Sequence, residues 1–361
     1  MPHHPDIRLG YVPLTDAAPL VIADALGLFA RQGVRVRLSR ESAWAGLRDK
    51  LAFGALDGAQ VLGPLVLALA AGAGGVRRRL TVSAGLARNG NTIVLSAALA
   101  ARIGPFAPPL SAAAFAEALH RRAEEGLPPP TLAVVFPHSS HNLLLRHWLA
   151  SGGLDPDHDL RLVVVPPPRM AEALAQGAIE GFCAGEPWGS HAIAQGAGRF
   201  ALATGDIWAD HPEKLLAWAE GFAEAREAEL IAATAAVIEA ALWLEIPANR
   251  PAAARLLQER AFPELPLSTI AAALEGRVAG CETPLAAPMR FAAASRPRRE
   301  EAAAWLAAMR RWGHLAGTEA ELLAPWRADL WDRAAARLPA PPLPGRAAPS
   351  PLLDTPTETD A

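Results

Sequence analysis

Short apolar runs alternate with helix-patterned segments through the first part of the chain, and this alternation constrains the fold more than any other feature. The pattern predicts strands over 7–12, 34–39, 56–62 and 79–87, with helices over 17–31, 43–53 and 64–71 between them. Strands that alternate with helices of this length are typical of α/β folds with a largely parallel sheet. The first part of the chain is therefore predicted to form one α/β lobe.

A second set of the same units follows a proline-rich connection. Strands are predicted over 131–136, 161–165 and 178–183, with helices over 141–150 and 169–176 and a further helix that ends near Gly196. Each predicted strand leads through a short polar or proline-containing loop into its helix, as in the first set. The sequence thus predicts a second α/β lobe.

The pattern becomes helical beyond Pro212. Alanine-rich amphipathic runs cover 214–245, 250–261, 266–275 and 299–312. Because this part shows no strand of its own, we expect it to pack on the first lobe. The predicted organisation is a first lobe of residues 1–96 and 205–338, a second lobe of residues 97–204, and a disordered Pro/Ala/Ser/Thr-rich tail of residues 339–361.

Composition excludes several classes of function. The formal net charge is −3 without basic blocks, which argues against direct binding of nucleic acid. Although 51% of the residues are apolar, charged residues or prolines interrupt the apolar runs before they could span a membrane. Cys183 and Cys281 match no metal-ligand spacing and are expected to be reduced thiols. The first residues lack the pattern of an export leader, so we expect a cytoplasmic protein.

Polar side chains follow several of the predicted strands. They lie at 11–16, 42–44, 60, 89–92, 138–142 and 185–188. Ligands of open parallel sheets bind beyond the carboxyl ends of the strands, where helix N-termini favour an anion. The chain carries neither a Gly-x-Gly-x-x-Gly nor a Walker-type phosphate loop, so these loops fit a small anion better than a nucleotide.

Individual residues in these loops allow more than one interpretation. His138 and His141 could bind a metal, but no zinc motif surrounds them, so a contact to a ligand or a capping role fits better. Glu186 could contact a ligand, orient a donor or cap the following helix, and Lys214 could bind an anion or lie on the surface. No nucleophile elbow is present, so we expect no catalytic residues. Without a zinc motif or a nucleotide-binding motif, we also expect no metal and no cofactor.

Several segments resemble one known family, the nitrate- and bicarbonate-binding proteins of ABC transporters, together with their cytoplasmic relatives, the nitrate sensors of NasS type. The matching segments are 10–20 (GYVPLTDAAPL), Trp44 with 48–51 (RDKL), 56–60 (LDGAQ), 89–91 (NGN), 141–153 (HNLLLRHWLASGG), 164–168 (VVPPP), 181–188 (GFCAGEPW) and 207–214 (IWADHPEK). The resemblance covers roughly residues 6–315, and its last two segments are the most specific.

The resemblance implies a type II periplasmic-binding-protein fold, in which two lobes close on a ligand and a helical C-terminal extension packs on the first lobe. It also implies an oxyanion site formed by Trp44, Asn91, His141, Glu186 and Lys214. In one respect the chain departs from the transporter relatives, which carry glutamine where this chain has Asn91. If His141 is protonated, anion binding should strengthen at lower pH.

The function implied is that of a cytoplasmic nitrate or nitrite sensor. Such a sensor holds an RNA-binding antiterminator of NasT type, with an ANTAR domain, and releases it when the anion binds. The alternative is the substrate-binding component of an ABC importer for nitrate, nitrite, bicarbonate or a similar small anion. A third interpretation, a pyrimidine-precursor synthase of the thiamine pathway, shares the fold, but the cysteine-rich iron motif of those enzymes is absent.

Overall fold

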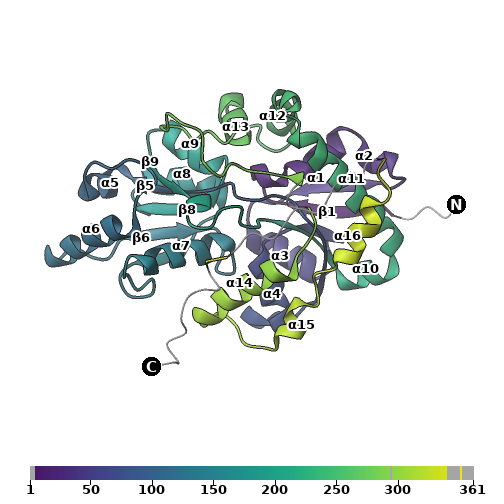
Figure 1. The fold of residues 1–361 in the computed structure, drawn as a ribbon, viewed down its shortest axis with the longest axis horizontal. Helices are drawn as coiled ribbons and strands as arrows, with labels where there is room; N and C mark the ends of the chain where they lie inside the picture. Colours follow the sequence, from purple (N-terminus) through teal and green to yellow (C-terminus); the bar gives the residue numbers. More distant parts are fainter. Residues whose placement is uncertain (1–4, 293–294, 340–349, 352–361) are drawn as a thin grey trace.

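The computed structural model describes residues 5–292, 295–339 and 350–351 and contains two five-stranded sheets. The first sheet has the order β2-β1-β3-β10-β4 and the second the order β7-β6-β8-β5-β9. The strands of the first sheet are β1 (Ile7–Tyr11), β2 (Val36–Arg40), β3 (Gly58–Val61), β4 (Leu80–Gly85) and β10 (Leu215–Ala219). Those of the second are β5 (Asn91–Ser96), β6 (Thr131–Val134), β7 (Arg161–Val164), β8 (Gly181–Gly185) and β9 (Gly198–Ala203). The predicted two-lobed α/β architecture is confirmed (Figure 1).

Helices cover both sheets. The first lobe carries α1 (Ala18–Ala25), α2 (Leu28–Arg31), α3 (Trp44–Ala52) and α4 (Gly63–Ala71). The second carries α5 (Ala97–Ile103), α6 (Ala112–Glu124), α7 (Ser140–Ser151), α8 (Met170–Ala175) and α9 (Trp188–Ala194). The C-terminal part adds α10 (Glu220–Ala225), α11 (Glu227–Glu245), α12 (Arg250–Arg260), α13 (Leu267–Leu274), α14 (Arg299–Arg311), α15 (Glu319–Leu323) and α16 (Ala328–Ala335).

The C-terminal helices pack mainly on the first lobe, as predicted. Helix α11 lies against α1 and α16, and α14 lies against α4 while also reaching α7 of the second lobe (Figure 1). The hydroxyl of Tyr11 donates to the carbonyl of Arg260, 3.1 Å away, and so joins the end of β1 to α12. No single helix in the described ranges is both long and apolar enough to cross a membrane; one pair, bent by 96° between Glu227–Glu245 and Pro247–Arg260, passes only when joined.

Three strands, β5, β9 and β10, were not predicted as such, and all of their pairings are antiparallel. Strand β10 falls in the segment predicted to be helical, and it pairs with β3 and β4. Residues 215–218 are all buried and form an unbroken apolar run. The periodicity of apolar residues alone does not distinguish such a strand from a buried helix. Strand β5 pairs with β8 and β9. The sheets are therefore mixed rather than largely parallel.

The position of β5 also moves the lobe boundary. Because β5 belongs to the second sheet, the chain leaves the first sheet before Asn91, whereas the predicted boundary follows residue 96. Most of the predicted disordered tail, residues 339–361, lies outside the described residues, which include only 339, 350 and 351 of it.

The two segments that cross between the sheets run side by side. One joins β4 to β5 over residues 86–90, and the other joins β9 to β10 over residues 204–214. Their backbones are hydrogen-bonded from Leu86 N to Lys214 O (2.7 Å), from Glu213 N to Ala87 O (2.9 Å) and from Asn89 N to His211 O (3.1 Å). The two crossings therefore form one connected ribbon between the lobes.

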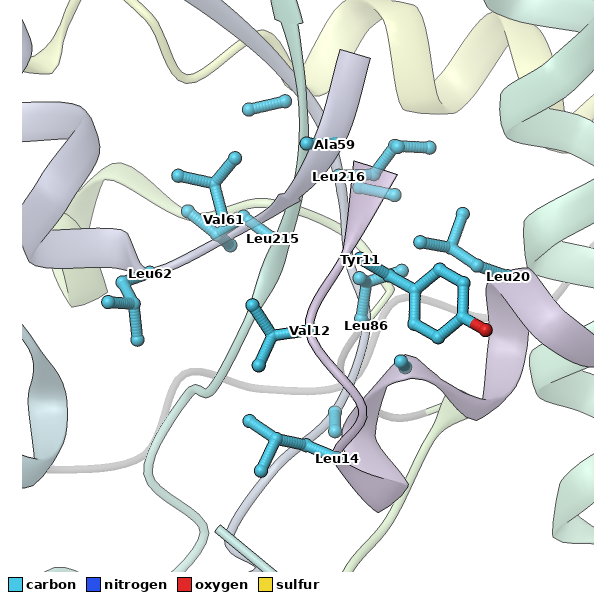
Figure 2. Close-up of a cluster of buried hydrophobic side chains, with 14 of the residues drawn as sticks. Tyr11, Val12, Leu14, Leu20, Ala59, Val61, Leu62, Leu86, Leu215 and Leu216 are labelled. Carbon is cyan, nitrogen blue, oxygen red and sulfur yellow. The ribbon is translucent and has the colours of Figure 1, made fainter. Parts of the chain in front are cut away.

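The core of the first lobe lies directly beneath this ribbon. Figure 2 shows the buried side chains at the ends of its central strands, among them Val12 after β1, Val61 in β3, Leu86 after β4 and Leu215 in β10. Burial of such side chains contributes about 1.5–3 kcal/mol each. The packed strand ends hold the polar loops that follow them in fixed positions.

Gly58 tests how tightly β3 and β10 are packed. A Cβ atom at this position would lie 2.6 Å from Cε3 of Trp218 and 2.9 Å from Cδ2 of Leu9. The substitution Gly58→Ala is expected to lower the free energy of unfolding by about 1–3 kcal/mol, because neither buried neighbour can move freely. Urea unfolding followed by tryptophan fluorescence measures the effect.

The matched control is Gly46→Ala in helix α3. Gly46 is exposed and has no atom within 4 Å of the added methyl group, so alanine should leave the free energy of unfolding unchanged or raise it by up to about 1 kcal/mol. Equal stability of Gly58→Ala and the unaltered protein would contradict the close packing of these strands.

Candidate functional site

A buried lysine lies where the returning crossing enters the first sheet. The ammonium nitrogen of Lys214 is 2.8 Å from Oδ2 of Asp16 and 2.5 Å from Oε2 of Glu213. All three side chains are almost completely buried. Asp16 belongs to a short 3₁₀ helix (Thr15–Ala17) in the loop after β1. A buried cation of this kind persists only where opposite charges accompany it.

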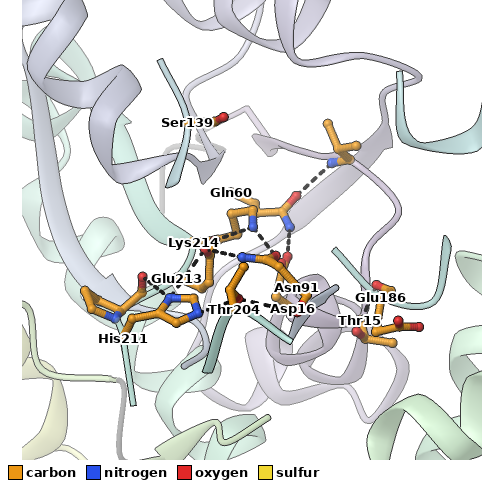
Figure 3. A network of polar contacts seen from close by, with 12 residues as sticks. Thr15, Asp16, Gln60, Asn91, Ser139, Glu186, Thr204, His211, Glu213 and Lys214 are labelled. Carbon is orange, nitrogen blue, oxygen red and sulfur yellow. Dashed lines mark hydrogen bonds and ion pairs between the residues drawn. The ribbon is translucent and has the colours of Figure 1, made fainter. Parts of the chain in front are cut away.

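Both lobes contribute to the polar network around Lys214 (Figure 3). Asn91, the first residue of β5, donates its side-chain N–H to Oε1 of Glu213 at 2.6 Å. From β3 of the first lobe, Gln60 donates to Asp16 and accepts the backbone N–H of Val12 at 2.8 Å. The network therefore joins the second sheet to the strand ends of the first.

The returning crossing adds His211 to the network. Its Nε2 lies 2.8 Å from Oγ1 of Thr204, and its Nδ1 lies 3.6 Å from Oε1 of Glu213. Burial lowers the pKa of His211, which keeps the ring neutral. A neutral ring bonded to Thr204 fixes the segment that carries Glu213 and Lys214.

Charges within the network favour an ionised Lys214 and an ionised Glu213. Burial opposes both charged forms, but Asp16 and Glu213 outweigh it and raise the pKa of Lys214. Burial is likewise outweighed at Glu213, where the charge of Lys214 contributes most to lowering the pKa to about 2. Burial raises the pKa of Asp16 in spite of the nearby ammonium. The lysine is therefore a cation that two carboxyl groups already accompany.

His141 faces this network from the second lobe. Helix α7 begins at Ser140, and its cap is Ser139, whose hydroxyl accepts the backbone N–H of Asn142 at 3.1 Å. His141 is fully buried, and neither of its ring nitrogens has a hydrogen-bond partner among the described residues. Burial, with a further effect of Lys214, lowers the pKa of His141 to about 3. The ring is therefore neutral near pH 7, in contrast to the protonated form considered from the sequence.

Trp44 covers the lysine from the first lobe. It is the first residue of α3, and the centre of its ring lies 5.9 Å from Nζ of Lys214, within the range of a cation–π contact. Three residues of this network carry buried polar atoms without a hydrogen-bond partner in the described structure: Trp44 Nε1, Asn91 Oδ1 and both ring nitrogens of His141; Ser140 Oγ, beside His141 in the chain, is a further such atom. Each such atom costs about 1–3 kcal/mol unless a partner is supplied, so the cluster indicates a ligand site.

Glu186 takes a different position from the one that the resemblance implies. Its carboxylate accepts the hydroxyl of Thr92 at 2.9 Å and the backbone N–H of Ser190 at 3.2 Å, in the first turn of α9. Burial raises the pKa of Glu186. Figure 3 shows Glu186 beside Thr15 and apart from Lys214. The carboxylate thus acts as a helix cap, one of the roles that the sequence left open.

The loops of the two lobes also touch through this region. Thr15 donates its backbone N–H and its hydroxyl to the carbonyl of Glu186, at 2.8 and 2.9 Å. The indole of Trp188 donates to the carbonyl of Pro13 at 2.7 Å. These contacts bind the loop after β1 to the loop after β8 and hold the two lobes together over the network.

Four of the five predicted site residues therefore come together: Trp44, Asn91, His141 and Lys214. Sequence reasoning did not single out Glu213 or the pairing of Asp16 with Lys214, although an acidic residue beside one of only two lysines was a usable signal. His138 does not join His141; its ring lies 5.9 Å from that of His314. Within the described residues no group of three or more His, Cys, Asp or Glu side chains is arranged to hold a metal ion.

Comparisons with known proteins agree with this architecture. Residues 1–258 match the NMT1-like family. The nitrate/nitrite binding protein NrtA of Synechococcus elongatus is 33% identical over 347 residues, which cover 91% of this chain and 77% of that protein. The crystal structure of the periplasmic nitrate-binding protein NrtA from Synechocystis PCC 6803 superimposes with a TM-score of 0.84 at 30% identity, covering 92% of this chain and 89% of that one.

A longer relative matches over only part of its length. The nitrate import ATP-binding protein NrtC of Synechocystis is 40% identical over 237 residues, which are 65% of this chain and 34% of that protein. This chain thus spans about a third of that relative. The family match over most of the chain and the extended similarity to NrtA lead to one conclusion: the protein belongs to the NMT1-like family, in the branch that contains the NrtA-type nitrate- and bicarbonate-binding proteins.

Proposed function

We propose that the buried site around Lys214 binds nitrate or nitrite. The observation that carries the proposal is the cluster of unpartnered polar atoms beside a buried ammonium, contributed by Trp44, Asn91, Ser140 and His141. A small planar monoanion can accept N–H and O–H groups from several directions and needs no paired arginine. The relatives named as nitrate/nitrite binding proteins support this choice of anion.

The charges already present shape how an anion binds. Asp16 and Glu213 already accompany the ammonium of Lys214, so a monoanion entering alone would meet no uncompensated positive charge. Uptake of a proton together with the anion removes this conflict. His141 is the proton acceptor. Its ring nitrogens have no hydrogen-bond partner in the part of the chain that the structure describes, and the charges of Lys214, Glu213 and His211 act on its pKa. The anion and the imidazolium would then neutralise each other.

We further propose that the protein acts in the cytoplasm as a sensor that holds an antiterminator of NasT type. Contacts between the loops, from Thr15 to Glu186 and from Trp188 to Pro13, bind the lobes in one arrangement. An anion that bridges the same lobes favours that arrangement, and a partner that prefers separated lobes is then released.

An importer is the second candidate, and the names of the relatives favour it. The similarity to an import ATP-binding protein and to a periplasmic NrtA suggests the substrate-binding part of an ABC importer for nitrate, nitrite or bicarbonate. Cell fractionation separates the two roles, because a sensor remains with the cytoplasmic fraction and an importer component with the envelope.

Lysine substitution tests the site directly. In calorimetric titrations with nitrate, nitrite and bicarbonate, the unaltered protein is expected to bind at least nitrate or nitrite. Lys214→Ala is expected to weaken this binding by 100-fold or more, roughly the 3 kcal/mol of a charge-assisted hydrogen bond. The matched control is Lys50→Ala, which removes the only other lysine, an exposed one paired with Glu41 at 2.9 Å. This control should bind as the unaltered protein does.

Trp44→Phe is a second variant, for the case in which Lys214→Ala does not fold because two buried carboxyl groups have lost their cation. Phenylalanine keeps an aromatic ring over Lys214 and removes the unpartnered indole N–H, so binding should weaken by about fivefold to tenfold. An unaltered protein that binds none of the three anions would exclude the proposed function.

Proton uptake predicts the direction of the pH dependence. The pKa of His141 is about 3 in this structure, and a bound anion raises it, so the complex holds more protons than the free protein. Affinity for nitrate should therefore rise as the pH falls from 8.5 to 5.5, approaching tenfold per unit below the pKa of the complex. Titration in buffers of different ionisation enthalpy counts the proton, and His141→Gln should remove the dependence. An affinity that is constant over this range contradicts proton uptake by His141.

The sensor role has its own test. The purified protein should form a complex with an antiterminator of NasT type in anion-free buffer, and millimolar nitrate or nitrite should dissociate it. Lys214→Ala should form a complex that the anion no longer dissociates. If the proteins do not associate although the anion binds, the sensor role is wrong and the binding function stands.

A further inference from the structure

A basic cavity opens on the C-terminal part of the first lobe, outside the buried site. It has a volume of about 360 Å³ and lies between residues 296–300 and residues 326–329, at the start of α14. Four arginines line it, Arg296, Arg298, Arg299 and Arg327, together with Trp326 and the acidic residues Glu300 and Asp329. The lining therefore carries more positive than negative side chains.

Two of these arginines have carboxylate partners of their own. Arg296 binds Asp332 through two N–H groups, each at 2.9 Å. Arg327 binds Asp329 in the same paired way, at 2.7 and 2.6 Å. These pairs place the two arginines at the wall of the cavity with their charges largely balanced.

Arg298 differs from them. Its Nε and Nη2 atoms are buried and have no hydrogen-bond partner among the described residues. The nearest carboxylate oxygen is Oε1 of Glu301, at an ion-pair distance of 4.0 Å from Nε. That oxygen lies only 2.5 Å from Nη2 of Arg88, which is buried more deeply. Two guanidinium groups thus share one carboxylate, and the closer contact belongs to Arg88.

This sharing leaves positive charge in a poorly solvated place. Burial lowers the pKa of Arg298 in spite of Glu301, and the charges of Arg88 and Arg296 lower it further. A partly buried guanidinium without its hydrogen bonds is costly, and an anion that supplied acceptors would recover that cost. The N-terminus of the thirteen-residue helix α14, which begins at Arg299, adds a partial positive charge on the same side.

We propose that this cavity is a second anion site, which binds a phosphate group through Arg298. A guanidinium presents parallel N–H donors that match two oxygens of a phosphate, and the cavity has room for a group larger than a nitrate ion. The group comes either from free inorganic phosphate or from a small phosphomonoester. None of the residues that line the cavity belongs to the Lys214 network, although Arg298 also lines a smaller neighbouring cavity together with Glu213.

Calorimetric titration of the full chain with inorganic phosphate in low salt tests the proposal. Saturable binding with one phosphate per chain is expected, and Arg298→Gln should weaken it at least tenfold. Arg37→Gln is the matched control: Arg37 is exposed on β2, at the opposite edge of the first sheet from β4, and its loss should leave phosphate binding unchanged. Nitrate binding by Arg298→Gln should equal that of the unaltered protein.

A second variant covers the case in which Arg298→Gln does not fold. Arg299 is exposed and begins α14, where an acidic residue suits the helix dipole, so Arg299→Glu should fold and still weaken phosphate binding severalfold. Glycerol 3-phosphate then separates the sources: tighter binding than that of phosphate identifies a phosphomonoester site, and equal or weaker binding identifies a site for free phosphate. No saturable binding of either compound, or unchanged binding by both variants, would overturn the proposal.

Discussion

The ammonium group of Lys214 is buried between two carboxyl groups, and the rest of the polar site is arranged around it. Glu213 precedes Lys214 in the chain, Asp16 comes from the loop after β1, and Asn91 reaches Glu213 from the second sheet. Removing the ammonium would leave two buried carboxyl groups without their cation, at a cost of several kcal/mol. The same requirement holds the ends of three separate segments at one point.

This point coincides with the ribbon that joins the lobes. The two crossings are hydrogen-bonded to each other from Leu86 to His211, and the returning one carries both Glu213 and Lys214. A ligand that contacts Lys214 therefore acts on a segment that connects the two lobes. The loop contacts of Thr15 with Glu186 and of Trp188 with Pro13 also join the two lobes, so the proposed site and the contacts between the lobes lie in the same region. The proposed coupling of anion binding to a change of shape requires such an arrangement.

Sequence reasoning predicted the order of most elements because short apolar strands and amphipathic helices differ in period. It failed at β10, where residues 215–218 are all buried and no periodicity of apolar residues remains. It also placed β5 in the wrong lobe, because the pairing of a strand with strands distant in sequence leaves no local pattern. The resemblance, rather than the spacing, brought Trp44, His141 and Lys214 together in advance. The second carboxylate and the capping role of Glu186 depend on tertiary contacts, which no local signal specifies.

A crystal structure of the protein grown with nitrate tests the central claim most directly. The structure described here predicts planar density in contact with the ammonium of Lys214, with N–H groups of His141 and Trp44 directed at its oxygens and both lobes in contact with it. Nitrate bound elsewhere, with Lys214 enclosed by Asp16 and Glu213 as it is now, would contradict the claim that this network is the anion site.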